Sequence, residues 1–275
     1  PASNVDMHNT AVGFNSMYGL TTGIRNTAVG SYALDATVTG TDNAAVGYAA
    51  LGANTTGGLN SAFGYKAMEA STTGIQNVAV GYQALVTATT ASYNVGVGRE
   101  ALVSTTTGAN NTAIGTNSLQ LNTTGDRNVA VGKSALDTNT TGAVNVAVGY
   151  LAMDANTTGN SNTAIGGYAL DANTTAGDNT AIGNSALTLN TTGASNTAVG
   201  IAALGANTTA SNNVAVGGSA LAANTTGTGN IAIGVQALDA NTTASNNTVI
   251  GYLAATTLNS GAENVIIGRE TGKVA

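Results

Sequence analysis

Hydrophobic and polar residues follow a pattern that repeats every seventeen residues along almost the whole chain. In residues 145–161, NVAVGYLAMDANTTGNS, Val146 and Val148 flank Ala147, which is the period-two alternation of a β-strand. A second apolar pair, 152–153, follows a Gly and two variable residues, and the polar segment NTTG comes next. Asn, Thr and Gly favour turns, because Asn and Thr side chains bond nearby backbone and Gly tolerates positive φ. We therefore expect each repeat to form one coil with two short strands and two bends.

Two residue types mark the period without a single interruption. An Asn recurs every seventeen residues from Asn9 to Asn264, and a Gly follows each Asn four residues later. A fixed short period is typical of a solenoid, in which each repeat is one coil stacked on the next. We expect the Asn amides to stack as a ladder and the Gly residues to allow a bend where no Cβ fits. The central members of these ladders are Asn77, Asn94, Asn111, Asn128, Asn145, Asn162, Gly81, Gly98, Gly115, Gly132, Gly149 and Gly166.

The length of the repeat narrows the fold class. Seventeen residues are too few for a strand plus a crossover helix, and the deep apolar positions lie five apart rather than the six of a triangular hexapeptide coil. The sequence therefore predicts an all-β fold, a parallel β-solenoid of the flat β-roll type with sixteen 17-residue repeats over residues 9–268. Residues 1–8 form a lead-in and residues 269–275 a tail. At a stacking distance of roughly 4.8 Å, the fifteen complete repeats would extend about 70 Å.

The strand positions predict which side chains face the core. The fourth residue of each repeat is always Val, Ile or Phe and is expected to be the deepest. The third residue is nearly always Ala, although a face in contact with water would admit Lys, Thr or Glu. We expect a second copy of the chain to pack there, and a trimer is the simplest closed arrangement of parallel coils. This expected oligomer face consists of Ala130, Ala147, Ala164, Ala181 and Ala198.

Composition removes several classes of protein. Charged residues make up 7% and aromatic residues 4%, yet 43% of the chain is hydrophobic, which is too much for a disordered segment. No Cys is present, so stability must come from repeated backbone hydrogen bonds rather than disulfides. The net charge of −6 includes no basic run, and no apolar run approaches a membrane span, so we expect neither nucleic-acid binding nor membrane insertion.

The residues capable of chemistry are few and scattered. The only His is His8, with Asp6 nearby, and no nucleophile, base and oxyanion site can be assembled, so we do not expect an enzyme. Carboxylates recur after the Leu or Met of the repeat, but other residues interrupt the row, and Ca²⁺ needs six or more converging oxygens. We expect no metal or cofactor there. These carboxylates are Asp35, Glu69, Asp137, Asp154, Asp171 and Asp239.

The Asn-Thr-Thr segment, present nine times from Asn54 to Asn241, has three interpretations. Turn capping is the first, N-glycosylation at Asn-x-Thr is the second, and an ice-binding array of Thr side chains is the third. The Gly that usually follows argues against a flat strand at this place. Aromatic residues after the repeated Gly can stack on sugars or anchor a protein contact, and Tyr48, Tyr65 and Tyr82 are expected to form a stacked ladder.

The repeat also resembles a known type of protein. The segments NTAVGSYAL, NVAVGYQAL and NTAIGNSALTLNTTG are similar to the β-roll repeats of bacteriophage tail-fibre proteins, and the similarity extends from about Asn9 to Gly268. The head repeats of trimeric autotransporter adhesins share the Asn-x-Ala-Val-Gly core but have shorter repeats. The resemblance implies a parallel homotrimer, located outside the cell or on a virion surface. It also implies a fibre or adhesin shaft that holds a binding tip for a cell-surface receptor or glycan.

Two further functions stay open at this stage. Coils of this kind can join end to end through exposed β-edges, which would make the chain the subunit of an extracellular filament. The regular Thr side chains would alternatively suit an ice-binding β-solenoid.

Overall fold

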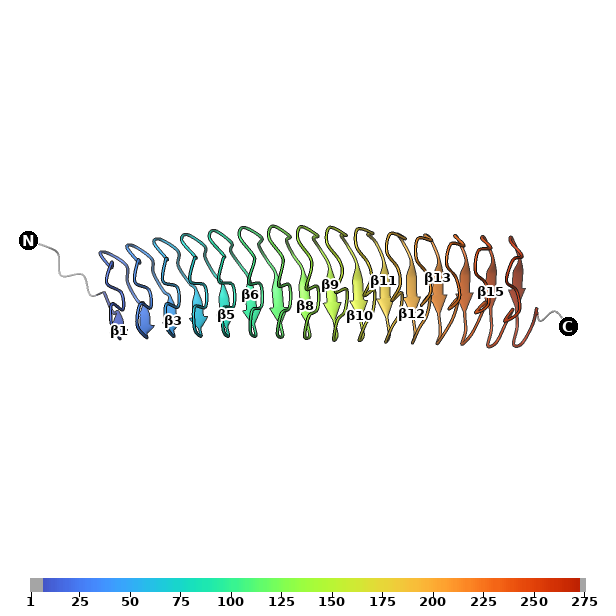
Figure 1. The fold of residues 1–275 in the computed structure, drawn as a ribbon, viewed down its shortest axis with the longest axis horizontal. Coiled ribbons are helices and arrows are strands. Elements are labelled where there is room, and N and C mark those ends of the chain that lie inside the picture. Colours follow the sequence, from blue (N-terminus) through green and yellow to red (C-terminus); the bar gives the residue numbers. More distant parts are fainter. Residues whose placement is uncertain (1–6, 273–275) are drawn as a thin grey trace, which may run out of the picture. The chain divides into compact units, whose positions relative to one another are not determined.

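The computed structural model describes residues 7–272, and this range contains parallel β-strands, bends and turns but no helix. The chain forms two compact units, Pro1–Lys133 and Ser134–Ala275. Each coil carries one short strand, drawn as an arrow in Figure 1. These observations confirm the predicted all-β parallel β-solenoid with coils of seventeen residues.

The strands are three residues long, and each unit holds eight of them. In the first unit they are β1 Thr10–Val12, β2 Thr27–Val29, β3 Ala44–Val46, β4 Ser61–Phe63, β5 Val78–Val80, β6 Val95–Val97, β7 Thr112–Ile114 and β8 Val129–Val131. In the second unit they are β9 Val146–Val148, β10 Thr163–Ile165, β11 Thr180–Ile182, β12 Thr197–Val199, β13 Val214–Val216, β14 Ile231–Ile233, β15 Thr248–Ile250 and β16 Val265–Ile267. Within each unit every strand pairs in parallel with the next, and equivalent repeat positions face each other, as Ala147 faces Ala164.

The segment that carries the Ala-Leu pair is not a strand, so the prediction of two strands per coil is wrong. In the fifth coil, Gln83 and Leu85 both have a left-handed backbone with φ of 53°. The Gln83 N–H donates to the Tyr65 carbonyl of the preceding coil, and the Leu85 N–H donates to the Ala101 carbonyl of the next. The reason lies in the pair itself: Ala84 and Leu85 are consecutive and both fully buried, whereas consecutive residues of a strand point to opposite faces.

The two faces of the strand are the reverse of those predicted. Ala164, in the middle of β10, is 0% exposed, whereas Ile165 beside it is 39% exposed. Gly96 takes the place of this Ala in β6, and a Cβ built there would lie 3.3 Å from Leu85 Cδ1. The middle residue therefore packs inside the coil against the Leu column, where only a small side chain fits.

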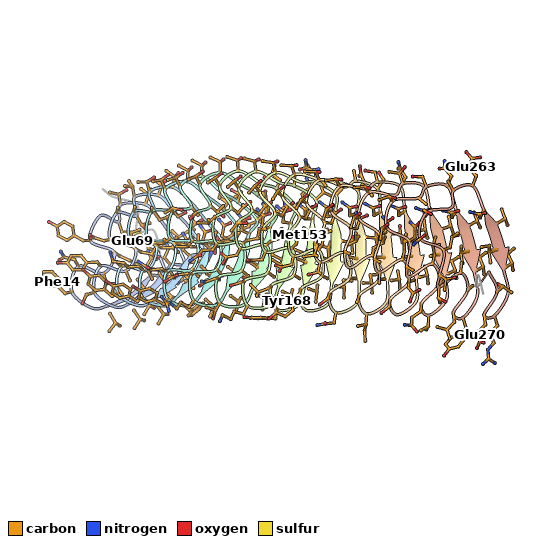
Figure 2. The ribbon with its side chains drawn as sticks, turned by 45° about the vertical axis from the view of Figure 1, so that its right-hand side comes forward. Phe14, Glu69, Met153, Tyr168, Glu263 and Glu270 are labelled. Carbon is orange, nitrogen blue, oxygen red and sulfur yellow. The ribbon has the colours of Figure 1, made fainter. Side chains whose placement is uncertain are left out.

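This packing corrects the predicted oligomer face. Ala130, Ala147, Ala164, Ala181 and Ala198 are all fully buried within their own chain and cannot contact a second copy. The first and third residues of each strand point outward instead. The deepest side chains are the Leu and Met residues of the return segment, such as Met153, which Figure 2 shows inside the coil, in contrast to Phe14 at the surface of the first unit.

Candidate functional site

The repeated Gly residues occupy positions that exclude any side chain. Gly149 has a φ of +142°, a conformation that L-residues rarely adopt. A Cβ built on Gly149 would lie 2.5 Å from the carbonyl oxygen of Gly166 in the next coil. The same close approach recurs at Gly81 and Gly98, so these Gly residues set how closely successive coils stack.

The repeated Asn residues form a buried hydrogen-bonded ladder. Asn162 Oδ1 accepts from the backbone N–H and the Nδ2 of Asn179, at 3.0 and 3.3 Å. Asn162 Nδ2 donates to Asn145 Oδ1 at 3.2 Å and to the Ala176 carbonyl at 2.9 Å. Each amide thus links one coil to the next and also holds a bend. Asn77, Asn94, Asn111, Asn128, Asn145 and Asn162 are all fully buried.

The Asn of the Asn-Thr-Thr segment forms a second ladder that the sequence reasoning missed. Asn156 Nδ2 donates to Asn139 Oδ1 at 2.8 Å and to the Gly159 carbonyl at 3.1 Å. A glycan linked to this nitrogen would replace a donor inside a buried site, so N-glycosylation there is incompatible with the fold. The signal was present in the spacing, because this Asn repeats at the same interval of seventeen residues.

The two Thr residues of the same segment have different environments. Thr157 Oγ1 donates to the Thr174 carbonyl of the next coil at 3.0 Å. The second Thr of the pair, for example Thr141, Thr158 or Thr175, is exposed at a bend rather than on a strand. These hydroxyls therefore form one exposed column along the bends, not the flat strand array that the ice-binding interpretation requires.

The outward side of the strands is an apolar surface. We call the first and third residues of the strands the outer strand face. In the first unit its large exposed members include Val29, Phe63, Val80 and Ile114, and in the second unit Ile165, Ile182, Ile231 and Ile233. Contiguous apolar surface of this kind usually marks an interaction site.

Aromatic side chains gather beside the repeated Gly residues of the first unit. Tyr48 stacks on Tyr65 with ring centroids 5.4 Å apart and planes inclined by 13°, and Tyr65 stacks on Tyr82 at the same distance. The predicted Tyr ladder is therefore confirmed. Tyr32 stands at 73° to Tyr48, with the ring centroids 5.8 Å apart.

The carboxylates do not converge on a metal site. Among residues 7–272 no group of three His, Cys, Asp or Glu side chains is placed to hold a metal ion. Asp137, Asp154 and Asp171 follow one another at the same position of successive coils, and partial burial raises the pKa of all three. His8 is exposed, and Asp6, its predicted neighbour, lies outside the described residues. The described part of the chain also has no helix of the length and hydropathy needed to cross a membrane.

The fold and these columns define a class of protein, a parallel β-solenoid repeat protein with 17-residue coils. Comparison of the chain with known protein families, with known proteins and with solved structures gives no significant match. The similarity to tail-fibre repeats therefore rests on the repeat motif alone.

Proposed function

We propose that the chain is a non-catalytic structural protein, the shaft of a fibre or adhesin outside the cell or on a virion, built by several copies of this chain. The observation that carries the proposal is the outer strand face. Its first positions hold only Thr, Ala, Ser, Val and Ile, and its third positions only Val, Ile and Phe, with no charge at any strand. Charged side chains occur at other exposed positions of the coil, such as Lys133 and Arg99, so their exclusion from the outer strand face favours a covered surface.

The energetics favour association along this face. Burying a complete Val or Ile side chain contributes about 1.5–3 kcal/mol. Ile165 keeps 39% of its surface exposed, so covering it contributes roughly 1 kcal/mol. One such residue per coil, repeated over the eight strands of a unit, adds several kcal/mol. A homotrimer of parallel chains closes this face without leaving an open edge between copies.

The test is the mass of the protein in solution, measured by light scattering with electron microscopy of the same sample. We expect three chains of 26.7 kDa. The double variant Ile165→Lys with Ile182→Lys should dissociate the oligomer, because it places charges on the outer strand face. The matched control is Thr175→Lys with Thr192→Lys, which adds the same charge to the same two coils at exposed bend positions.

Other outcomes would change the proposal. A wild-type monomer would contradict the covered outer strand face, and long unbranched filaments would favour the end-to-end filament subunit instead. Thermal hysteresis together with a monomeric mass would favour the ice-binding β-solenoid. Binding of a cell-surface receptor or glycan by a fibre tip is a separate part of the proposal.

A further inference from the structure

A pocket interrupts the surface of the first unit beside the Tyr ladder. Its volume is about 320 Å³, and its lining includes Tyr32, Asp35, Tyr48, Ala49, Gly52 and Glu69. None of these residues belongs to a strand, so the pocket lies apart from the outer strand face. Volumes of this size are at the lower end of small-molecule sites.

The pocket exists because one coil lacks two side chains that its neighbours carry. Ala49 replaces the Tyr32 of the preceding coil, and Gly52 lies between Asp35 and Glu69 in the same column. The two carboxylates are therefore two coil spacings apart, about 9.6 Å, on opposite sides of Gly52. Gly52 is not required by its backbone, since it has no positive φ, unlike Gly47 of the same coil. A cavity is thus left by small residues that the coil itself does not demand.

The lining combines aromatic rings with hydrogen-bond acceptors. The Tyr32 and Tyr48 rings supply apolar contact area, and carboxylates accept hydrogen bonds from hydroxyl groups. Glu69 is paired with Lys66 at 3.1 Å, whereas Asp35 has no cation within ion-pair distance among the described residues. The carboxylate of Asp35 is therefore the uncompensated charge of the pocket, and hydroxyl groups of a ligand can donate hydrogen bonds to it.

The rings argue against a cationic ligand. A cation binds over the free face of an aromatic ring. One face of Tyr48 is stacked on Tyr65, and Tyr32 stands against it at 73°. The carboxylate of Glu69 already has an ammonium partner in Lys66. C–H groups also gain van der Waals contact at the ring edges, so a ligand with both C–H and hydroxyl groups fits the parts of the rings that stay exposed.

We propose that this pocket binds one hexopyranose ring, with hydroxyl groups donating to Asp35 and Glu69 and C–H groups packed on Tyr32 and Tyr48. The site is shallow and takes a single ring, so the expected Kd is on the order of 1 mM. The proposal does not depend on the oligomeric state or on the proposed shaft function.

The chain contains a matched control for this site. Ala202 and Gly205 have the same positions in a coil of the second unit, but Ser185, Thr188 and Ala222 stand there in place of Tyr32, Asp35 and Glu69. Gly52→Val should fill the pocket, and the coil tolerates this side chain, because Val86 stands at the equivalent position. Gly205→Val makes the same change where no ligand is expected.

The experiment is saturation-transfer NMR of the full chain with methyl glycosides of glucose, galactose, mannose and N-acetylglucosamine, each at millimolar concentration. We expect transfer to at least one glycoside, a loss of at least about tenfold in affinity for Gly52→Val, and no change for Gly205→Val. Asp35→Ala provides a second variant should Gly52→Val disturb the circular dichroism spectrum. The absence of transfer to every glycoside would overturn the proposal. Equal transfer in Gly52→Val and wild type, or displacement of the glycoside by choline at equal concentration, would also overturn it.

Discussion

The Asn ladder permits a quantitative test through Asn162→Ala. The substitution removes four side-chain hydrogen bonds from a fully buried residue, two with Asn179 and one each with Asn145 and Ala176. Asn145 Oδ1 still accepts a hydrogen bond from the backbone N–H of residue 162. The Ala176 carbonyl still accepts one from Asn173 Nδ2. The Asn179 N–H, however, loses Asn162 Oδ1 as its acceptor.

These contacts set the expected magnitude. An orphaned buried donor costs about 1–3 kcal/mol, and each further hydrogen bond contributes about 0.5–1.5 kcal/mol net. Because the remaining partners keep other bonds, we expect a loss of roughly 3–4 kcal/mol in the free energy of unfolding. The exposed Asn184, whose Oδ1 accepts from the Ser185 hydroxyl at 3.1 Å, provides the control Asn184→Ala, which is expected to change stability by less than about 0.5 kcal/mol.

The assay is guanidinium unfolding followed by circular dichroism at equal protein concentrations, since association would add to the measured stability. Hydrogen exchange of residues 160–180 provides a second measurement, because each coil of a solenoid contacts only its neighbours and the loss should be local. Equal midpoints for Asn162→Ala and Asn184→Ala would refute the view that the ladder stabilises the stack.

Three further predictions concern the backbone and the carboxylates. Gly149→Ala should destabilise the protein by more than about 2 kcal/mol, because its Cβ would meet the next coil. A Cβ at Gly218 would have no atom within 4 Å, so Gly218→Ala should be close to neutral in the same unfolding assay. Val144 has a left-handed backbone with φ of 61°, which is costly for a β-branched residue, and Gly229 stands at the equivalent position. Val144→Asn should therefore raise stability by about 1 kcal/mol, and a lower melting temperature would contradict this. Burial raises the pKa of Asp154, so its ionised form destabilises the folded chain. The free energy of unfolding should rise as pH falls from 7 towards about 4 and level off below the pKa of Asp154 in the unfolded chain. Asp154→Asn should flatten this profile and stabilise the protein at pH 7. An unchanged profile would contradict the assignment.

The repeat made the stacking predictable from the sequence. A strict period without insertions leaves only one way to align the coils, so Asn145 and Asn162 had to lie in one column, as did Gly149 and Gly166. The hydrogen bonds of Asn162 and the Cβ contact at Gly149 follow from that alignment.

The details within one coil were less predictable. The alternation identified a strand but not its inward face. In a strand of three residues, either the middle residue or the two outer ones can face the core. The consecutive buried pair Ala84 and Leu85 contained the missing information, since no strand buries two neighbours on one side. The left-handed backbone of Gln83 and Leu85 could not be predicted from the sequence, because neither is a residue type that favours positive φ. The pocket at Gly52 depends on neighbours in three successive coils and could be recognised only after the alignment was known.

Both faces of the strand are restricted to small or apolar residues. A position that holds only small or apolar residues where charged ones would be tolerated is a position in contact with something. For Ala147 and Ala164 that contact is the Leu column of their own chain. For Ile165 and Ile182 the chain supplies no such cover, since both keep more than a third of their surface exposed. The same restriction on residue type thus has an internal cause on one face of the strand. On the other face we propose an external cause, which is why the outer strand face, rather than the Ala column, is the surface to mutate first.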